Sequence, residues 1–245
     1  MTATKKQLAG WASLKNRKDR DETGLFLAEG RKLVDEARAA GWRFEALLAD
    51  QASLEAELED GYGLTPEQMA RVSGFRTAPD VMAVVRKPMS FNRPRWEPGT
   101  LALVLDGLQD PGNVGTLVRT AAWFGFQAVF HTADTADPYG PKAVQASMGA
   151  LFRVKTAEVD DTWFETLPGQ TPILGTFLEG ESIFEVELPG AGLLVLGNEG
   201  HGIRSELEAR ITRRLTVPRF GAGVESLNVG AAAAVLMAEF RRGRR

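Results

Sequence analysis

Residues 101–132 read LALVLDGLQDPGNVGTLVRTAAWFGFQAVFHT and predict a strand, a helix and a second strand. The run 101–107 is continuously apolar, which is typical of a strand buried on both faces. Apolar residues then recur at helical spacing over 113–125, and 127–132 is again strand-like. A strand–helix–strand unit of this kind indicates parallel strands joined by a crossover helix.

The same alternation continues to the end of the chain. Repeated β-α-β order predicts an α/β fold, with a mostly parallel sheet covered by helices on both faces. Ligands of such sheets bind beyond the carboxyl ends of the strands, so we expect the site in the loops that follow them. Further strands are predicted at 151–156, 171–177, 192–200 and 213–218, and further helices at 140–150, 205–211 and 226–242.

A proline-rich stretch with little apolar periodicity, at 88–98, predicts a linker. Upstream of it, strands and helices also alternate, and Thr65-Pro66-Glu67-Gln68 is a helix-start signal. The chain is therefore predicted to contain a small α/β domain at 1–90 and a larger α/β domain at 98–245. In the smaller domain, strands are expected at 24–30, 44–50 and 80–88, and helices at 31–41 and from Thr65.

The composition narrows the classes of chemistry that the chain can perform. Among 245 residues there is no cysteine, and there are only two histidines. This excludes a disulfide framework, a thiolate metal site and a cysteine nucleophile, and we expect no metal. The longest apolar run, 231–238, is too short to span a bilayer, and no secretory signal is visible. We therefore expect a soluble, cytoplasmic protein with no membrane partner.

Basic side chains gather in two segments although the net charge is −3. Residues 1–20 carry six lysines and arginines against Asp19 alone, and residues 71–95 carry six against Asp80 alone. The chain also ends in RRGRR. Such patches fit contact with nucleic-acid phosphates, and the alternative is a set of solvated faces.

Three segments in the predicted loops contain residues suited to a site. The first, DPGNVGTLVRTA (110–121), places Asn113 at the expected helix N-cap and Arg119 inside the helix. The second, GNEGHG (197–202), surrounds Glu199 with glycines and matches neither a dinucleotide fingerprint nor a Walker loop. The third, VPRFGAGVESLNVGAA (217–232), places Ser226 as the N-cap of the last helix. Each segment alone also has a structural interpretation, as a salt bridge, a glycine turn or a cap.

Together and in this order, the segments resemble the three signature motifs of the SpoU/TrmH-type RNA 2′-O-ribose methyltransferases of the SPOUT superfamily. Asn113, Gly115 and Arg119 match the first motif. GNEGHG matches the second, and Pro218 with SLNV (226–229) matches the third. ASMGALFRV (146–154) is also similar to the family, and Gly230 stands where many members have a second serine. FLAEGRKLVDEA (26–37) resembles the start of the L30e-like substrate-binding domain that many members carry.

The resemblance implies a deep trefoil knot in the C-terminal domain and S-adenosylmethionine as cofactor. It also implies a homodimer, for which the helix 113–125 and the final helix are candidate interface elements. A guanidinium group stays protonated and so cannot accept a proton as a simple base would. Arg119 would instead clamp a phosphate and stabilise the developing alkoxide. The catalytic residues implied are Arg119, Asn113, Glu199, Ser226 and Asn228. The cofactor-binding residues implied are Thr176, Gly197, Asn198, Gly202, Val217 and Leu227.

RNA is the partner that this resemblance implies. The additional N-terminal domain favours ribosomal RNA, since relatives of a single domain often act on transfer RNA. Two alternatives remain open at this point: a transfer RNA 2′-O-methyltransferase, and a non-catalytic RNA-binding or assembly factor with the same fold.

Overall fold

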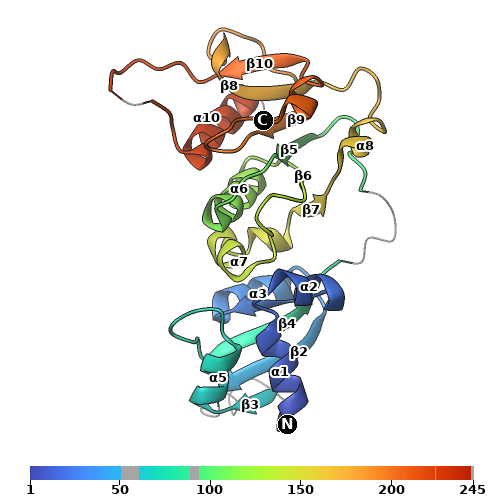
Figure 1. Ribbon diagram of the computed structural model, residues 1–245, viewed down its shortest axis with the longest axis vertical. Coiled ribbons are helices and arrows are strands. Elements are labelled where there is room, and N and C mark those ends of the chain that lie inside the picture. The colour runs from blue at the N-terminus through green and yellow to red at the C-terminus, as the bar shows by residue number, and fades with distance from the viewer. Residues whose placement is uncertain (51–60, 89–93, 224, 244–245) are drawn as a thin grey trace. The chain divides into compact units, whose positions relative to one another are not determined.

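The computed structural model describes residues 1–50, 61–88, 94–223 and 225–243 (Figure 1). The chain divides into two compact units. Unit 1 consists of Met1–Met89 and Asp137–Arg153, and unit 2 consists of Ser90–Ala136 and Val154–Arg245. Residues 89–93 of the predicted linker lie outside the described residues, so the boundary at 88–98 stays a prediction.

Unit 1 contains a four-stranded sheet in the order β1-β4-β2-β3. Strand β4 runs antiparallel to both β1 and β2, whereas β2 and β3 are parallel. The strands are β1 (Leu25–Glu29), β2 (Phe44–Asp50), β3 (Tyr62–Leu64) and β4 (Val81–Arg86). The helices are α1 (Lys5–Ser13), α2 (Arg17–Thr23), α3 (Arg31–Ala39), α5 (Pro66–Val72) and α7 (Pro141–Ser147).

The helix-start signal at Thr65 is confirmed, because Thr65 and Gln68 form a reciprocal capping box. The basic segment 1–20, in contrast, folds into α1 and most of α2. One of its six cations, Arg20, is buried and forms an ion pair with Asp137 at 2.7 Å. Arg20 is therefore a structural residue and does not belong to an exposed basic patch.

Segment 137–153 packs with unit 1 through aromatic contacts. The indole of Trp42 donates a hydrogen bond to the Phe152 carbonyl oxygen at 3.0 Å, and both rings contact Phe26. The predicted strand at 151–156 is wrong in its first half for this reason. Ala150–Phe152 forms a 3₁₀ turn that places Phe152 against these rings, and the strand begins only at Lys155.

Unit 2 contains a six-stranded sheet in the order β10-β8-β9-β5-β6-β7, and every described pair in it is parallel. This confirms the predicted parallel sheet. The strands are β5 (Leu101–Leu105), β6 (Ala128–His131), β7 (Lys155–Glu158), β8 (Ile173–Ser182), β9 (Gly192–Leu196) and β10 (Arg213–Thr216). The helices are α6 (Pro111–Trp123), α8 (Asp161–Phe164), α9 (Ser205–Glu208) and α10 (Val229–Arg241).

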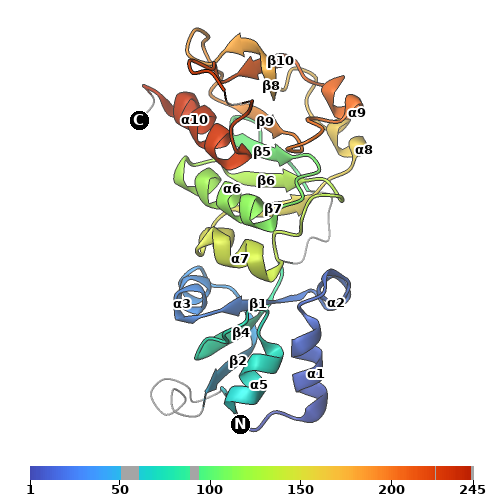
Figure 2. The ribbon, with the colours of Figure 1, turned by 60° about the vertical axis from the view of Figure 1, so that its left-hand side comes forward.

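Helices cover both faces of this sheet, as predicted. Helices α6 and α10 lie together on one side, where Phe126 and Phe240 meet edge to face, and α8 and α9 lie on the other (Figure 2). Under α8 and α9, Phe130, Trp163 and Leu207 belong to one buried cluster. Strands β5 and β9 are buried along their whole length, which accounts for their continuous apolar sequence. No helix within the described ranges is long and apolar enough to cross a membrane.

We predict that Glu29 makes the stability of unit 1 depend on pH. Its carboxylate is buried and accepts hydrogen bonds from the Ser73 hydroxyl at 2.5 Å and the Gly74 amide at 2.9 Å. Burial raises the pKa of Glu29 above its ordinary 4.5, and the two hydrogen bonds and the charge of Lys15 offset this only in part. The folded state therefore binds the proton more tightly than the unfolded state does.

The resulting stabilisation is fully present below the ordinary value of 4.5 and is lost as the pH rises through the raised folded-state pKa. Urea unfolding of the full chain at several pH values measures it. Glu29→Gln should lack this loss, so its stability relative to the wild type should increase with pH. The exposed Glu22→Gln is the control and should follow the wild type. A constant difference between Glu29→Gln and the wild type would contradict the prediction.

Candidate functional site

The loop after β9 is a small closed hairpin. The amide and carbonyl groups of Asn198 and Gly202 pair reciprocally, at 2.9 Å each. The side-chain oxygen of Asn198 accepts hydrogen bonds from the amides of Gly200 and His201, at 2.8 and 3.1 Å. Gly197 lies so close to Gly202 that a Cβ there would overlap the backbone. The second sequence motif therefore folds into one defined turn that requires glycine at its start.

The first motif opens helix α6, but its N-cap differs from the predicted one. The helix begins at Pro111, and the Asp110 side chain accepts the hydrogen bond from the Asn113 amide at 2.7 Å. The prediction of Asn113 as the cap is wrong because an aspartate followed by proline provides a stronger start one turn earlier. The side chain of Asn113 is thereby free to bond elsewhere.

The third motif opens helix α10, and here too the predicted cap is wrong. Asn228 is the cap, and its side-chain oxygen accepts hydrogen bonds from the Gly230 and Ala231 amides at 2.9 and 3.4 Å. Ser226 lies two residues earlier and is exposed. The glycine at position 230 is buried beside this cap, and a Cβ there would meet the Asn228 side-chain oxygen at 3.1 Å.

Side chains from all three motifs meet in one hydrogen-bonded chain. The Asn228 amide donates to the Asn113 side-chain oxygen at 3.2 Å, and the Asn113 amide donates to the Glu199 carboxylate at 2.9 Å. These residues lie up to 115 positions apart in the sequence. The structure therefore brings together three of the five catalytic residues that the sequence implies.

Arg119 does not join this chain. It lies six residues after Asn113 along α6, about 9 Å further along the helix axis, and its side chain is exposed. Within the described residues it forms no hydrogen bond and no ion pair, so the salt-bridge interpretation finds no support there. Its guanidinium group is available to a ligand.

Of the residues implied in cofactor binding, Thr176 lies within β8, and the others lie in loops at the carboxyl edge of the sheet. Strand β8 pairs with β10 at Gly175 and again at Glu181, and the residues between them, which include Thr176, bulge out of register. Val217 directly follows β10, and Leu227 is half-exposed just before the Asn228 cap. With the hairpin 197–203, these loops border one stretch of the carboxyl edge.

Sequence reasoning missed the contribution of the loop after β6. The Gly107 amide donates to the hydroxyls of Thr132 and Thr135 at 3.0 and 3.1 Å, and the Gly107 carbonyl accepts from the Asn198 side chain at 2.7 Å. Gly107 has a positive φ of 68° and joins the loops after β5, β6 and β9. The available signal was the polar run Thr132-Ala133-Asp134-Thr135 directly after a predicted strand.

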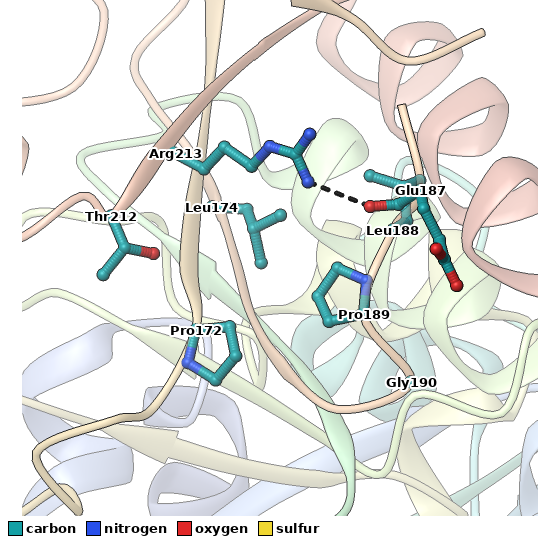
Figure 3. Close-up of a pocket in the computed structure, with 8 residues that line it drawn as sticks. All are labelled: Pro172, Leu174, Glu187, Leu188, Pro189, Gly190, Thr212 and Arg213. Atoms are coloured by element: carbon teal, nitrogen blue, oxygen red, sulfur yellow. Dashed lines mark hydrogen bonds between the residues drawn. The ribbon is translucent and has the colours of Figure 1, made fainter. Parts of the chain in front are cut away.

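A hollow of about 380 Å³ lies elsewhere on unit 2 (Figure 3). It is lined by the start of β8 and β10 and by the segment 187–190 before β9, so it lies toward the amino ends of these strands. Figure 3 shows the Arg213 guanidinium donating to the Glu187 carbonyl oxygen, at 2.9 Å. None of the predicted site residues lines this hollow, and the convergence of the motifs places the candidate site at the carboxyl edge instead.

This fold and this site together define a methyltransferase-type α/β domain with SpoU-like motifs. The model of the SpoU rRNA Methylase family matches residues 100–238, and the chain belongs to this family. Residues 5–83 match the model of an MRM3-like substrate binding domain. Both matches agree with the resemblance that the sequence motifs indicate.

Individual proteins resemble the chain over nearly its whole length. It is 31% identical over 247 residues to the 23S rRNA guanosine 2′-O-methyltransferase RlmP of Bacillus subtilis, covering 98% of each chain. A TrmH-family structure from Porphyromonas gingivalis is 39% identical, with a TM-score of 0.87 and 99% of each chain covered. The SpoU methyltransferase AviRb of Streptomyces viridochromogenes, solved in complex with AdoMet, is 26% identical with a TM-score of 0.86, covering 99% of this chain and 98% of that one.

We predict that Gly197→Ala will distort the glycine-rich hairpin. The added methyl group would overlap the backbone of Gly202 and Ile203, and overpacking of this kind costs about 1–3 kcal/mol. The control is Gly200→Ala, because a Cβ at Gly200 would meet only the Asn198 side-chain oxygen at 3.5 Å. Urea unfolding of both variants measures the difference. Equal stability of the two variants would show that the hairpin accommodates a side chain at its start.

Proposed function

We propose that this protein transfers the methyl group of S-adenosylmethionine to a ribose 2′-hydroxyl of ribosomal RNA. The observation that carries the proposal is the chain Asn228–Asn113–Glu199, which joins all three family motifs at the carboxyl edge of the sheet. Membership of the SpoU rRNA Methylase family supports the reaction. The relative RlmP, named for 2′-O-methylation of 23S rRNA, supports the class of RNA.

The loops at this edge fit S-adenosylmethionine, which supplies an electrophilic methyl group when bound. Such a ligand needs hydrogen-bonding groups for its adenine and its amino-acid end, and an apolar wall. Gly200 and Gly202 expose their backbone, and a Cβ at Gly202 would meet no other atom within 4 Å. The half-exposed Leu227 offers apolar surface. The residues that would hold the cofactor are Thr176, Gly197, Asn198, Gly202, Val217 and Leu227.

A trefoil knot is part of the proposal. Strand β10 lies at one end of the sheet, next to β8, whereas α10 packs beside α6, where Arg241 donates to the Phe124 carbonyl at 2.6 Å. The chain therefore passes from one end of the sheet to the helix that covers its middle. The resemblance to the family supports a knotted path in this part of the chain.

The side chains of the site have two roles in the proposed reaction, positioning of the ribose and stabilisation of charge. Asn113 and Asn228 hold Glu199 in place through neutral amides, and we assign this group and Ser226 to positioning of the ribose. Arg119 carries a positive charge, as guanidinium groups in proteins always do. It is therefore suited to clamp the adjacent phosphate and to stabilise negative charge developing on the hydroxyl oxygen.

The RNA-binding surface is assigned to exposed cations of unit 1. Lys15 of the first basic segment donates to the Arg71 carbonyl oxygen of the second at 2.8 Å, so the two segments are neighbours in space. Lys5, Lys18 and Arg71 are exposed. Contact of such a patch with RNA phosphates implies an affinity that falls steeply with salt. Ribosomal RNA as substrate also implies a compartment where ribosomes are assembled, which keeps the cytoplasmic location within the proposal.

We predict that Arg119→Ala will lower the rate of methyl transfer by about 100-fold or more, with little change in cofactor affinity. Unmodified ribosomal and transfer RNA serve as substrates, and nucleoside mass spectrometry detects the 2′-O-methyl product. Arg210→Ala, a change in an arginine outside the site, is the control. Product on transfer RNA alone would select the alternative substrate. Cofactor binding without transfer to either RNA would indicate a narrower substrate, such as an assembly intermediate, whereas neither binding nor transfer would favour the non-catalytic alternative. Near-normal turnover of Arg119→Ala would overturn its role as a clamp.

We place the interface of a homodimer on α6 and α10, and predict that Trp123 anchors it. Trp123 ends α6 with 84% of its surface exposed, which is unusual for the largest apolar side chain. Trp123→Ala should weaken self-association by about tenfold or more in analytical ultracentrifugation. Leu178→Ala removes an apolar side chain that is 79% exposed outside both helices, and should have no effect. A wild type that stays monomeric at micromolar concentration would rule out the dimer.

A further inference from the structure

A buried carboxylate stands directly behind the site. Asp106 is the first residue after β5, and its side chain is fully shielded from solvent. Its two oxygens are occupied by a single residue, Arg204. One oxygen accepts from the Arg204 backbone amide at 2.8 Å, and the other accepts from the guanidinium Nε at 2.7 Å.

The contact between Asp106 and Arg204 lies at the end of the glycine-rich hairpin. Arg204 comes directly after the hairpin 197–203, so Asp106 fixes the C-terminal end of that hairpin. The next residue, Gly107, fixes the other end, because its carbonyl accepts from the Asn198 side chain at 2.7 Å. Two consecutive residues after β5 thus hold both ends of the loop that carries Glu199.

The turn that contains Gly107 is itself held in place by hydrogen bonds. The Thr132 and Thr135 hydroxyls accept hydrogen bonds from the Gly107 amide. Thr132 in turn donates to the Asp134 carboxylate at 2.5 Å. A Cβ at Gly107 would meet another oxygen of the same carboxylate at 3.0 Å, so the turn is closely packed.

Arg204 contributes both a main-chain and a side-chain donor to this contact. The amide and the guanidinium Nε each donate to a different oxygen of the Asp106 carboxylate, and the second of these bonds joins two charged groups. A second carboxylate, Asp161, lies 3.2 Å from the same guanidinium. Burial alone lowers the pKa of Arg204, but the hydrogen bond to Asp106 and the charges of Asp106 and Asp161 outweigh it and raise the pKa. Arg204 therefore stays charged, and losing it would leave Asp106 buried without a cation.

We propose that Asp106 and Arg204 are a positioning pair that holds the hairpin 197–203 in the shape that binds S-adenosylmethionine. The inference rests on the proposed function for the identity of the ligand. The effect of the pair on the order of the hairpin in the free protein does not depend on that function. The pair acts through the loop backbone and touches neither the cofactor nor the RNA.

Hydrogen exchange of the cofactor-free full chain tests the pair directly. Four amides of the hairpin, at Asn198, Gly200, His201 and Gly202, have hydrogen-bond acceptors within it. Arg204→Met should speed the exchange of peptides that cover these amides by about tenfold or more, since the change removes a hydrogen bond between two charged groups. Exchange in β5 should stay as in the wild type.

The matched control is Arg210→Met. Arg210 lies six positions later in the chain and forms an ion pair with Glu165 at 3.3 Å, close in sequence to Asp161. Its loss removes the same charge from the same region but leaves Asp106 and the hairpin in contact. Unchanged exchange of the hairpin in Arg204→Met, or equal changes in both variants, would overturn the positioning role.

Calorimetric titration with S-adenosylmethionine provides the second readout. Arg204→Met should raise the dissociation constant by about tenfold or more, and Arg204→Lys should recover only part of the loss. The KM for RNA should not change. Global unfolding would reduce the number of binding sites without changing the dissociation constant of the remaining ones. An unchanged constant in Arg204→Met would overturn the proposal.

The two readouts separate this proposal from the proposed function. If the wild type does not bind S-adenosylmethionine, the proposed function fails, and the assignment of the pair to cofactor binding is overturned with it. If the wild type binds the cofactor but methylates no RNA, only the proposed function fails. In that case the exchange rates and the dissociation constants still decide whether Asp106 and Arg204 shape the hairpin.

Discussion

The parallel pairing of β5 with β9 is the constraint on which the site depends. The two strands are in register from Leu101 opposite Gly192 to Leu105 opposite Leu196, and both are buried on both faces. This register makes them end side by side, so that the loop at 106 faces the hairpin at 197. A shift of one residue would turn every side chain of a strand to the other face. It would also move the hairpin away from the Asn113 side chain.

The site itself consists of loops whose shape is determined by backbone packing and hydrogen bonds rather than by an apolar core. The close approach of Gly197 to Gly202 and the positive φ of Gly107 each require glycine. Amide side chains also stabilise these loops, because the side-chain oxygens of Asn198 and Asn228 accept hydrogen bonds from main-chain amides. Loops of this kind bury little apolar surface, and the buried sheet beneath them fixes the positions of their ends.

The sheet of unit 2 could be predicted from the sequence because strands buried on both faces are continuous apolar runs. The same criterion caused the error at 151–156, since a short apolar run such as Leu151-Phe152 fits a buried strand and a buried turn equally well. The helix starts failed for a different reason. Asn113 and Ser226 are both good caps, but Asp110 and Asn228 compete with them and occupy better positions.

Long-range contacts were the part of the structure that no local pattern could reveal. The burial of Arg20 depends on Asp137, more than a hundred residues away, so a count of basic residues overstates the surface patch. The link between Asp106 and Arg204 spans 98 residues and leaves no periodic signal. The joining of the three motifs could be anticipated only from their resemblance to a known family, because spacing alone gave each of them an ordinary structural interpretation.

The separation of Arg119 from the Asn228–Asn113–Glu199 chain has a chemical consequence. Glu199 is held by a neutral amide and not by a cation, so its negative charge is not cancelled within the described residues. Arg119 keeps its positive charge equally available, because no carboxylate among those residues engages it. A guanidinium paired with Glu199 would have to break that pair before it could bind a phosphate. Neutral amides thus position the carboxylate while leaving the two opposite charges of the candidate site available to a ligand.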